Sequence, residues 1–311
     1  MQHGVIVDAE GQFSAPNRMI GDHTVSALGL GAMLLSVEDR PDRRQGIRTI
    51  HAALDAGLTV IDTADAYCLN AAETGHNERL VGEAVRSWGG DRDRVIVATK
   101  GGHYRARDGT WLLNGRAEHL RSACEASLVA LGVEAIDLYQ HHRPDPAVPY
   151  EDSVGALKEL QDEGKVRLVG IGNVSVSQIY EAMTIVDVAS VQNEFSPAFR
   201  ASIPEIEVCV RYNLAFLAWG PLGGMSAAGA LGQRHRAFDH IARSRGVSAQ
   251  QVCLAWEMAT ARVVIPIPGS RRPETILDSV NAMHLQLEQQ ELAELDADAG
   301  TALDHHLWEK S

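Results

Sequence analysis

Short apolar runs rich in Val, Ile and Leu alternate along the chain with longer stretches of helical periodicity. Eight such runs occur at spacings that suit strand–helix units. They span residues 25–33, 58–62, 94–100, 135–142, 166–173, 189–195, 214–219 and 262–269. Uninterrupted apolar runs are typical of parallel strands that are buried on both faces. The pattern therefore predicts eight parallel strands with helices between them.

Helix signals occupy the intervals between these runs. Three segments place apolar residues on one helical face and are each followed by a glycine, which is a stop signal. These glycines are Gly57, Gly132 and Gly164. Farther along the chain, Ser248 is placed to cap a helix, and Pro273 suits the first turn of another.

Eight strands that alternate with helices over roughly 250 residues predict an α/β fold of the (β/α)8 TIM-barrel type. A doubly wound sheet is the alternative, but no GxGxxG element precedes an acidic residue at dinucleotide-binding spacing. No linker or shift of composition divides the chain, so residues 1–311 are expected to form a single domain. The short segment before Val25 is expected to form a hairpin that closes the bottom of the barrel.

The charge and the cysteine content argue against several classes of partner and of structural site. Acidic residues outnumber basic ones by 41 to 28, so neither nucleic acid nor an anionic membrane is an expected partner. The four cysteines (Cys68, Cys124, Cys209 and Cys253) form no CxxC pair, which argues against a disulfide framework or a structural zinc site. The N-terminal residues lack a signal-peptide core, and no segment is long and apolar enough to span a bilayer. These features predict a soluble cytoplasmic protein.

Polar or otherwise special residues stand at the end of nearly every apolar run. Barrel enzymes place their active sites at the C-terminal ends of their strands, so these side chains are expected to share one rim. They are Asp62, Lys100, His142, Asn173, Gln192, Asn193, Trp219 and the pair Gly269-Ser270.

Three of these strand ends, together with a nearby tyrosine, combine into a candidate catalytic group. Asp62, Tyr67, Lys100 and His142 supply a carboxylate, a phenol, an ammonium and an imidazole. A free tyrosine has a pKa of about 10, and a neighbouring ammonium lowers that pKa by stabilising the phenolate. Lys100 is the expected neighbour, Asp62 would keep Lys100 charged, and His142 could hydrogen-bond a substrate oxygen. The group predicts a proton donor.

Each of these residues alone has an ordinary structural explanation. Asp62 could cap a helix, and Lys100 could be a solvated strand end. Tyr67 could be a packing aromatic, and His142 could be a structural histidine. A metal-dependent hydrolase using His141, His142 and Asp62 is a further alternative, but the first strand lacks an HxH pair, and no metal is expected. The occurrence of all four on neighbouring strand ends favours a catalytic group.

At these residues the sequence resembles the aldo-keto reductase superfamily, in particular its bacterial members. The motifs that carry the resemblance are IDTADAY, VATKGG, IDLYQHHRPD, VQNEFSP, WGPLGGM and IPIPGSRRPE, in this order along almost the whole chain. The resemblance implies an NADPH-linked oxidoreductase that interconverts a small aldehyde or ketone and an alcohol. It implies that Tyr67 is the acid, that Lys100 and Asp62 tune it, and that His142 orients the carbonyl.

The resemblance also implies a cofactor site. Asn173 and Gln192 match positions that hold the nicotinamide carboxamide, and Trp219 matches an aromatic that stacks on the ring. A glycine-rich turn at 220–224 could receive a pyrophosphate, and the arginines after Ser270 suit a phosphate monoester, which favours NADPH over NADH. The full predicted set is Gly31, Ala32, Met33, Asp62, Asn173, Gln192, Trp219, Gly220, Pro221, Leu222, Gly224, Gly269, Ser270, Arg271, Thr275, Asp278 and Ser279.

The chain departs from the family pattern at Gly172 and Ser279, and in the longer loop 68–74 after Tyr67. Substrate specificity is expected to lie in the loops 68–76, 102–114 and 224–236. Basic residues within 102–114, such as Arg105, raise the hypothesis of a polar or phosphorylated carbonyl substrate. A redox sensor that binds nicotinamide with little turnover is the alternative function. The substrate, the physiological direction and the oligomeric state are left open.

Overall fold

Eight parallel strands form one sheet in the computed structural model, which describes residues 17–225 and 227–299. Neighbouring strands follow the order of the chain, so every connection runs to the next strand of the sheet. The strands are β3 (Leu30–Gly31), β4 (Val60–Asp62), β5 (Ile96–Gly101), β8 (Ile136–His141), β9 (Val166–Gly172), β10 (Val188–Glu194), β11 (Ala215–Trp219) and β12 (Val264–Pro266).

The first and last strands meet and close the sheet into a barrel. Gly31 forms a parallel bridge with Gly269, and its amide donates to the carbonyl oxygen of Pro268 at 3.0 Å. The amide of Gly29 donates to the carbonyl oxygen of Pro266 at 2.9 Å. The predicted (β/α)8 barrel is confirmed.

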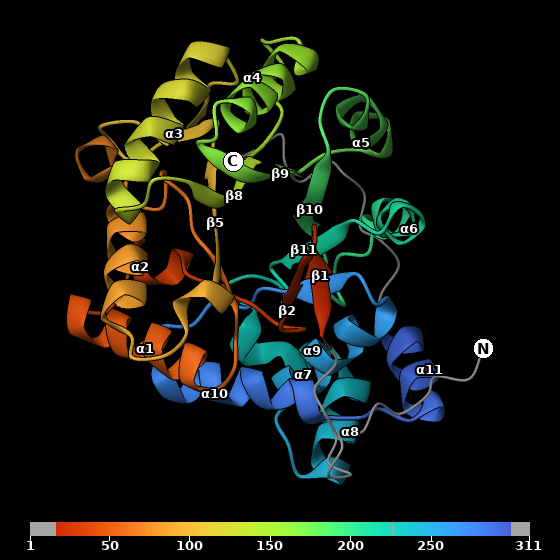
Figure 1. The fold of residues 1–311 in the computed structure, drawn as a ribbon. Coiled ribbons are helices and arrows are strands. Elements are labelled where there is room, and N and C mark those ends of the chain that lie inside the picture. Colours follow the sequence, from red (N-terminus) through yellow and green to blue (C-terminus); the bar gives the residue numbers. More distant parts are fainter. Residues whose placement is uncertain (1–16, 226, 300–311) are drawn as a thin grey trace.

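Helices surround the barrel (Figure 1). They are α1 (Arg43–Asp55), α2 (His76–Ser87), α3 (Ala117–Leu131), α4 (Tyr150–Asp162), α5 (Val176–Met183), α6 (Ile203–Tyr212), α7 (Leu231–Arg234), α8 (Arg236–Arg245), α9 (Ala249–Thr260), α10 (Pro273–Asn281) and α11 (Gln289–Asp298). The predicted boundary signals act as expected. Gly132 ends α3 in the left-handed conformation (φ 71°), and the Ser248 side chain accepts from the amide of Gln251 at the start of α9. Pro273 lies in the first turn of α10.

An N-terminal hairpin closes one end of the barrel, as predicted. Strands β1 (Arg18–Ile20) and β2 (His23–Val25) pair antiparallel and lie across the middle of the view in Figure 1. Ile20 and Val25 are buried in a cluster with barrel residues such as Val60. The guanidinium of Arg18 donates to the carbonyl oxygens of Met258 and Val264, which attaches the hairpin to α9 and β12.

Two predicted strands are wrong in extent. The run 25–33 is divided into the end of β2, an irregular segment, β3 and a 3-10 helix, η1 (Met33–Leu35). The irregular segment is held by side chains, since Ser26 Oγ donates to the carbonyl oxygen of Leu28 at 2.6 Å. The run 262–269 contributes only Val264–Pro266. Proline at 266 and 268 lacks an amide hydrogen, which limits ladder pairing there.

The loop 102–114 is ordered as a second hairpin, β6 (His103–Arg105) and β7 (Trp111–Leu113), which pair antiparallel. The residues after Tyr67 include a short 3-10 helix, η2 (Ala71–Glu73). Both loops follow the C-terminal ends of barrel strands, where they can shape a site.

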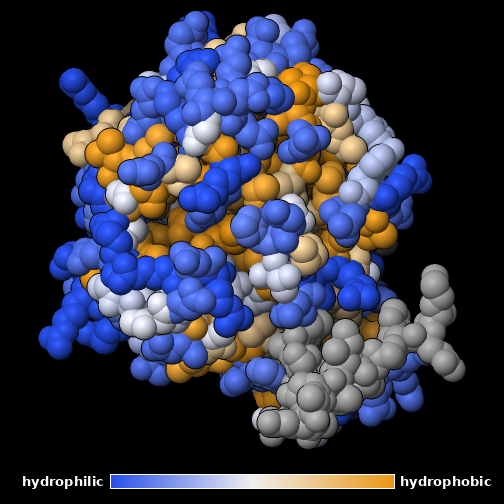
Figure 2. All heavy atoms as spheres, in the orientation of Figure 1, coloured by the Kyte–Doolittle hydropathy of each residue, from blue (hydrophilic) through white to orange (hydrophobic). Residues whose placement is uncertain are grey.

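The exterior is a mosaic of hydrophilic and hydrophobic residues on the face shown in Figure 2. Within residues 17–225 and 227–299, no helix has the length and apolar character needed to cross a membrane.

Barrel closure should depend on the missing side chain of Gly31. A Cβ at this position would lie 2.7 Å from the carbonyl oxygen of Ile267, so Gly31→Ala is expected to lower the free energy of unfolding by about 2 kcal/mol in urea titrations. Gly155→Ala on α4 is the control, because a Cβ there would meet nothing within 4 Å. This change should be neutral or stabilise by up to about 1 kcal/mol. Equal effects of the two changes would contradict the prediction.

Candidate active site

The four predicted catalytic residues lie together at the C-terminal end of the barrel. Asp62 ends β4, Lys100 lies near the end of β5, His142 follows β8, and Tyr67 lies in the loop after β4. All four are buried, with exposed fractions between 2% and 8%. Structural roles such as a solvated strand end for Lys100 therefore do not apply.

Lys100 is the centre of the group. Its Nζ donates to Asp62 Oδ2 at 2.6 Å, to the carbonyl oxygen of Thr63 at 2.9 Å and to the Tyr67 hydroxyl at 2.9 Å. These three acceptors use all three hydrogens of the ammonium. The arrangement fixes the position of the tyrosine hydroxyl relative to a buried positive charge.

The second oxygen of Asp62 is held by amides. Gln192 Nε2 donates to Asp62 Oδ1 at 2.7 Å, and Gln140 Nε2 approaches the same atom at 3.4 Å. Gln140 was not among the predicted site residues. Strand alternation could have found it, because residues two apart on β8 share a face, and Gln140 stands two before His142.

Burial and charge act in opposite directions on Tyr67 and Lys100. Burial raises the pKa of Tyr67 and Lys100 lowers it, and the balance is a raised pKa. The predicted lowering of the Tyr67 pKa is therefore wrong, because burial raises this pKa by more than Lys100 lowers it. Burial lowers the pKa of Lys100, but Asp62 and then Tyr67 outweigh it, and that pKa is raised. Both groups are protonated at neutral pH.

His142 is a neutral histidine beside Tyr67. Burial, together with the nearby His103 and Lys100, holds the pKa of His142 well below its usual value. The ring packs edge-on against Tyr67 with centroids 5.8 Å apart, and its Nδ1 is buried without a hydrogen-bond partner. A neutral imidazole retains one N–H that can donate to a ligand.

His141 faces away from this group. Its ring stacks on Tyr150 with centroids 5.9 Å apart, and neither ring nitrogen has a hydrogen-bond partner. Burial lowers the pKa of His141 to about 4. Of the two adjacent histidines, the structure thus brings only His142 to Tyr67.

The β6–β7 hairpin covers the tyrosine and histidine. The His103 ring lies 4.4 Å from the His142 ring, and the Trp111 ring lies edge-on to Tyr67 at 6.5 Å, measured between centroids. Arg105 on the same hairpin has a side chain only 3% exposed, which donates to the carbonyl oxygen of Cys68 and pairs with Glu38. This arginine is therefore engaged within the protein, against the hypothesis that it receives a phosphorylated substrate.

The residues predicted to hold a nicotinamide are linked to the same group. Asn173 donates through Nδ2 to the carbonyl oxygen of His142 at 2.9 Å and accepts from Trp219 Nε1 at 3.1 Å. Gln192 supports Asp62, as described above. A Cβ on Gly172 would lie 2.9 Å from the carbonyl oxygen of His142, which explains why this chain has glycine there.

The predicted pyrophosphate turn has the expected backbone. Gly220, Gly223 and Gly224 all have positive φ, and the amide of Gly223 donates to the carbonyl oxygen of Gly220 at 2.8 Å. Pro221 accepts a hydrogen bond from Cys253 Sγ, and Leu222 packs against the core. The turn directly follows Trp219 at the end of β11.

Arg271 is the predicted phosphate ligand whose surroundings are most informative. It forms no ion pair with a carboxylate in the described part of the chain, and its Nε is buried without a hydrogen-bond partner. Its Nη2 donates to the carbonyl oxygen of Glu38 at 2.9 Å. Ser270, one residue earlier, donates to the carbonyl oxygen of Arg272 at the start of α10.

The other predicted cofactor residues divide into two places. Gly31, Ala32 and Met33 lie at the end of β3, where the amide of Ala32 donates to the carbonyl oxygen of Asp62. Thr275, Asp278 and Ser279 lie on α10. Thr275 is exposed, whereas Ser279 is buried and donates to the carbonyl oxygen of Thr275. The carboxylate of Asp278 accepts from Ser248 and Gln251, so it also joins α10 to α9.

Two carboxylates near the group were not predicted. Asp65 is buried, its Oδ1 has no hydrogen-bond partner, and burial holds its pKa well above the usual value. Burial also raises the pKa of Glu78, which accepts from Thr99 Oγ1 at 2.6 Å. Asp65 stands in the motif with Tyr67, but nothing in the pattern distinguished it from a solvated loop residue.

Metal-ligating side chains and thiols add no further site among the described residues. No group of three His, Cys, Asp or Glu side chains could hold a metal ion there. All four cysteines are buried and unpaired with one another. Burial raises the pKa of Cys68 to about 11, so its thiol is protonated at neutral pH.

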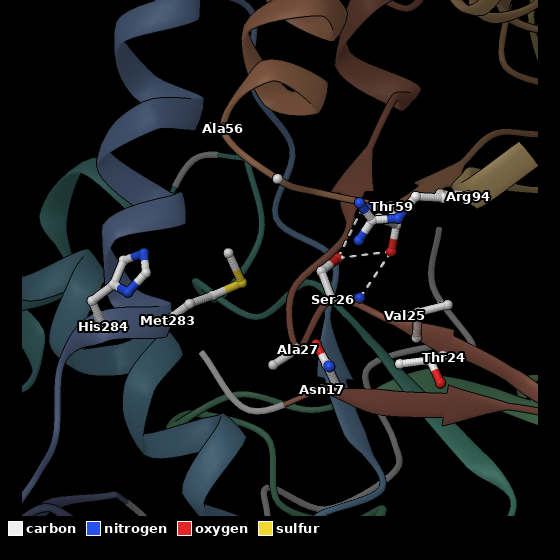
Figure 3. A pocket seen from close by; sticks show the side chains of 11 residues that line it. Asn17, Thr24, Val25, Ser26, Ala27, Ala56, Thr59, Arg94, Met283 and His284 are labelled. Carbon is white, nitrogen blue, oxygen red and sulfur yellow. Dashed lines mark hydrogen bonds between the residues drawn. The ribbon is translucent and has the colours of Figure 1, made fainter. Parts of the chain in front are cut away.

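A cavity of about 340 Å³ lies at the opposite end of the barrel, near the starts of the strands (Figure 3). Its walls include Ser26 and Thr59, whose hydroxyls and amides bond reciprocally, and Arg94, Met283 and His284. Because it precedes β3, β4 and β5, this cavity is separate from the residues at the C-terminal ends of the strands.

Comparison with known proteins agrees with this architecture. An uncharacterized oxidoreductase of Schizosaccharomyces pombe is 34% identical over 281 residues, covering 89% of this chain and 88% of that protein. A probable aldo-keto reductase 1 of Glycine max is 31% identical and covers 91% of each chain. The solved structure of an aldo/keto reductase from Klebsiella pneumoniae in complex with NADP and acetate has a TM-score of 0.76 and 28% identity, covering 91% of this chain and 95% of that one.

The closed barrel and these relatives define the protein as a barrel oxidoreductase. The family model described as Aldo/keto reductase family matches residues 27–298. The chain belongs to the aldo/keto reductase family.

Part of the protein's loss of folding stability at low pH should arise from His141. Its pKa of about 4 lies below the unfolded value of about 6.5, so the unfolded state binds the proton first and stability is lost as pH falls from about 6.5 to 4. His141→Leu is expected to reduce this loss by about 3 kcal/mol, measured by urea unfolding at pH 7 and pH 4. Tyr150→Phe keeps the stacked ring and should leave the pH dependence unchanged. An unaltered pH dependence in His141→Leu would refute the assignment.

Proposed function

We propose that this protein is an NADPH-dependent reductase that converts an aldehyde or ketone to an alcohol in a reversible hydride transfer. The observation that carries the proposal is the 2.9 Å contact between the Tyr67 hydroxyl and Lys100 Nζ, with Lys100 itself fixed by Asp62 at 2.6 Å. When a phenol in this setting gives its proton to a carbonyl oxygen, the neighbouring ammonium stabilises the phenolate that is left.

Each residue of the group has a defined part in the proton transfer. The raised pKa of Tyr67 keeps its hydroxyl protonated until the carbonyl oxygen gains negative charge and takes the proton. Lys100 then faces the phenolate, and Asp62 holds Lys100 in its charged form. The neutral ring of His142 donates a hydrogen bond that orients the carbonyl oxygen towards Tyr67. The buried position of the group keeps water away from these steps.

Residues at the same rim fit a nicotinamide dinucleotide with a phosphate monoester. Arg271 has an unpartnered buried Nε and no carboxylate partner in the described ranges, so its guanidinium could bind a phosphate monoester. The turn 220–224 contains glycines of positive φ, and its backbone amides could bind a pyrophosphate. Trp219 and Asn173 lie between this turn and His142 and would face the nicotinamide ring. When bound, the nicotinamide would supply the hydride. The Klebsiella pneumoniae relatives with NADP and NADPH, each 28% identical, support this choice.

A sensor that binds the cofactor with little turnover is the competing function. No contact in the described residues favours it, because the tyrosine, lysine, aspartate and histidine are all present and assembled. Steady-state oxidation of NADPH with a panel of small aldehydes separates the two functions. Tight NADPH binding without turnover on any of these aldehydes would favour the sensor.

Tyr67→Phe should remove the proton donor and preserve the fold. We expect kcat to fall by about 10²- to 10⁴-fold, whereas the Kd for NADPH, measured by fluorescence titration, should change by less than about twofold. Tyr104→Phe is the control, since Tyr104 lies on the covering hairpin and packs against His119. If Tyr67→Phe turned over at the parent rate, Tyr67 would not be the acid.

Arg271→Ala should weaken the binding of NADPH but not that of NADH. Loss of charge-assisted hydrogen bonds to a phosphate is expected to raise the Kd for NADPH by about 10- to 100-fold in calorimetric titrations. Arg262→Ala, an exposed arginine before β12 at the other end of the barrel, should leave both affinities unchanged. Equal weakening of NADPH and NADH by Arg271→Ala would show that this residue does not read the phosphate monoester.

A further inference from the structure

Glu38, in the loop between η1 and α1, is shared by two arginines from distant parts of the chain. Arg271 Nη2 donates to its backbone carbonyl oxygen at 2.9 Å, and Arg105 Nη2 donates to its carboxylate Oε1 at 3.1 Å. Arg271 belongs to the proposed phosphate end of the cofactor site, and Arg105 belongs to the hairpin that covers Tyr67. One residue therefore connects the two halves of the site.

The contact with Arg105 compensates a buried charge. The Arg105 side chain is 3% exposed, whereas that of Glu38 is 67% exposed. In residues 17–225 and 227–299, no other carboxylate lies within ion-pair distance of Arg105. A buried guanidinium without a counter-charge is costly, so Glu38 stabilises the position that Arg105 occupies.

Arg105 in turn holds the covering hairpin in place. Its Nε donates to the carbonyl oxygen of Cys68 at 2.9 Å, and its guanidinium lies 4.1 Å from the centre of the Trp111 ring. Cys68 directly follows Tyr67, and Trp111 packs edge-on against that tyrosine. Through Arg105, the charge of Glu38 thus secures the hairpin over the place where a carbonyl substrate would meet Tyr67.

The contact with Arg271 is the one that a phosphate would replace. A neutral carbonyl is a weaker acceptor for a guanidinium than a phosphate oxygen. A phosphate monoester that bound the unpartnered Nε of Arg271 and its Nη2 as a bidentate pair would therefore compete with the Glu38 carbonyl oxygen for Nη2. The residue next to Glu38, Asp39, has a φ of 57°, a left-handed conformation that its neighbours have to maintain.

We propose that Glu38 is a positioning residue that couples the phosphate end of the cofactor site to the covering hairpin. A phosphate monoester at Arg271 takes Nη2 from the Glu38 carbonyl oxygen and releases the strained loop. The carboxylate then holds Arg105 less firmly, and the hairpin opens for the carbonyl substrate. This inference rests on the proposed NADPH site and adds to it an effect of the cofactor phosphate on substrate entry.

Hydrogen exchange of the hairpin amides, followed by mass spectrometry, tests the coupling without turnover. The probe is adenosine 2′,5′-bisphosphate, with adenosine 5′-monophosphate as the ligand that lacks the monoester at the 2′ position. In the parent protein the bisphosphate is expected to accelerate exchange in residues 103–113 by about fivefold, and the monophosphate should not. Glu38→Gln keeps the backbone carbonyl but removes the charge. In this variant exchange should already be fast, and the bisphosphate should add less than about twofold.

Glu83→Gln is the matched control, because Glu83 pairs with Arg43 at the surface, between α2 and α1, and its ion pair involves no residue of the hairpin. It should respond to the bisphosphate like the parent protein. Binding of the bisphosphate is measured in parallel by calorimetry. If it binds and hairpin exchange does not change, the coupling is overturned and the proposed cofactor site stands. If it does not bind, both are overturned.

Steady-state kinetics gives a second readout that a purely structural role would not produce. In the parent enzyme the KM for an aldehyde is expected to be about fivefold higher with NADH than with NADPH, because NADH has no phosphate to open the hairpin. In Glu38→Gln the two KM values should converge, with kcat changed by less than about twofold. A KM ratio that Glu38→Gln leaves unchanged would overturn the proposal.

Discussion

The buried ion pair between Lys100 and Asp62 is the interaction on which the C-terminal face of this barrel depends. Removing both charges from water costs several kcal/mol per ion, and the pair is tolerated only when the remaining donors and acceptors are satisfied. Here Thr63, Tyr67 and Gln192 satisfy them. The strands that carry Asp62, Lys100 and Gln192 must keep their register, because a slip of one residue would turn each of these side chains to the opposite face.

The two imidazole rings near this pair, those of His142 and His103, are uncharged. Lys100 contributes to the lowered pKa of His142 and of His103, although burial contributes more in both cases. Two uncharged imidazoles can pack 4.4 Å apart, which two imidazolium rings in a dry site could not do without a counter-ion. Lys100 donates to the Tyr67 oxygen as well as to Asp62 and the Thr63 carbonyl oxygen, so a phenolate formed at Tyr67 would lie against a fixed positive charge. A fixed positive charge beside the phenolate favours donation of the phenol proton to a carbonyl oxygen.

Much of this arrangement could be predicted from the sequence, because strand ends in a parallel barrel converge whatever the loops do. The ends of apolar runs predict Asp62, Lys100 and His142, and alternation along β8 adds Gln140. The direction of the Tyr67 pKa was missed, since it depends on how completely the surrounding chain excludes water. Water is excluded there by packing between segments that are far apart in the sequence. The local pattern of apolar and polar residues does not reveal this packing.

The position of the β6–β7 hairpin also depends on packing that the local sequence pattern does not contain. Residues 103–113 carry little alternation. Strands β6 and β7 pair with each other, but the hairpin is held in place by a residue far away in the chain, through the ion pair of Arg105 with Glu38. Taken alone, the basic residues of this loop predict a contact with a polar or phosphorylated substrate. In the folded chain the carboxylate of Glu38 takes that charge, and Arg105 becomes a structural tie. Strand ends therefore bring Asp62, Lys100 and His142 together, and long-range contacts between loops, such as that of Arg105 with Glu38, hold the hairpin that covers them.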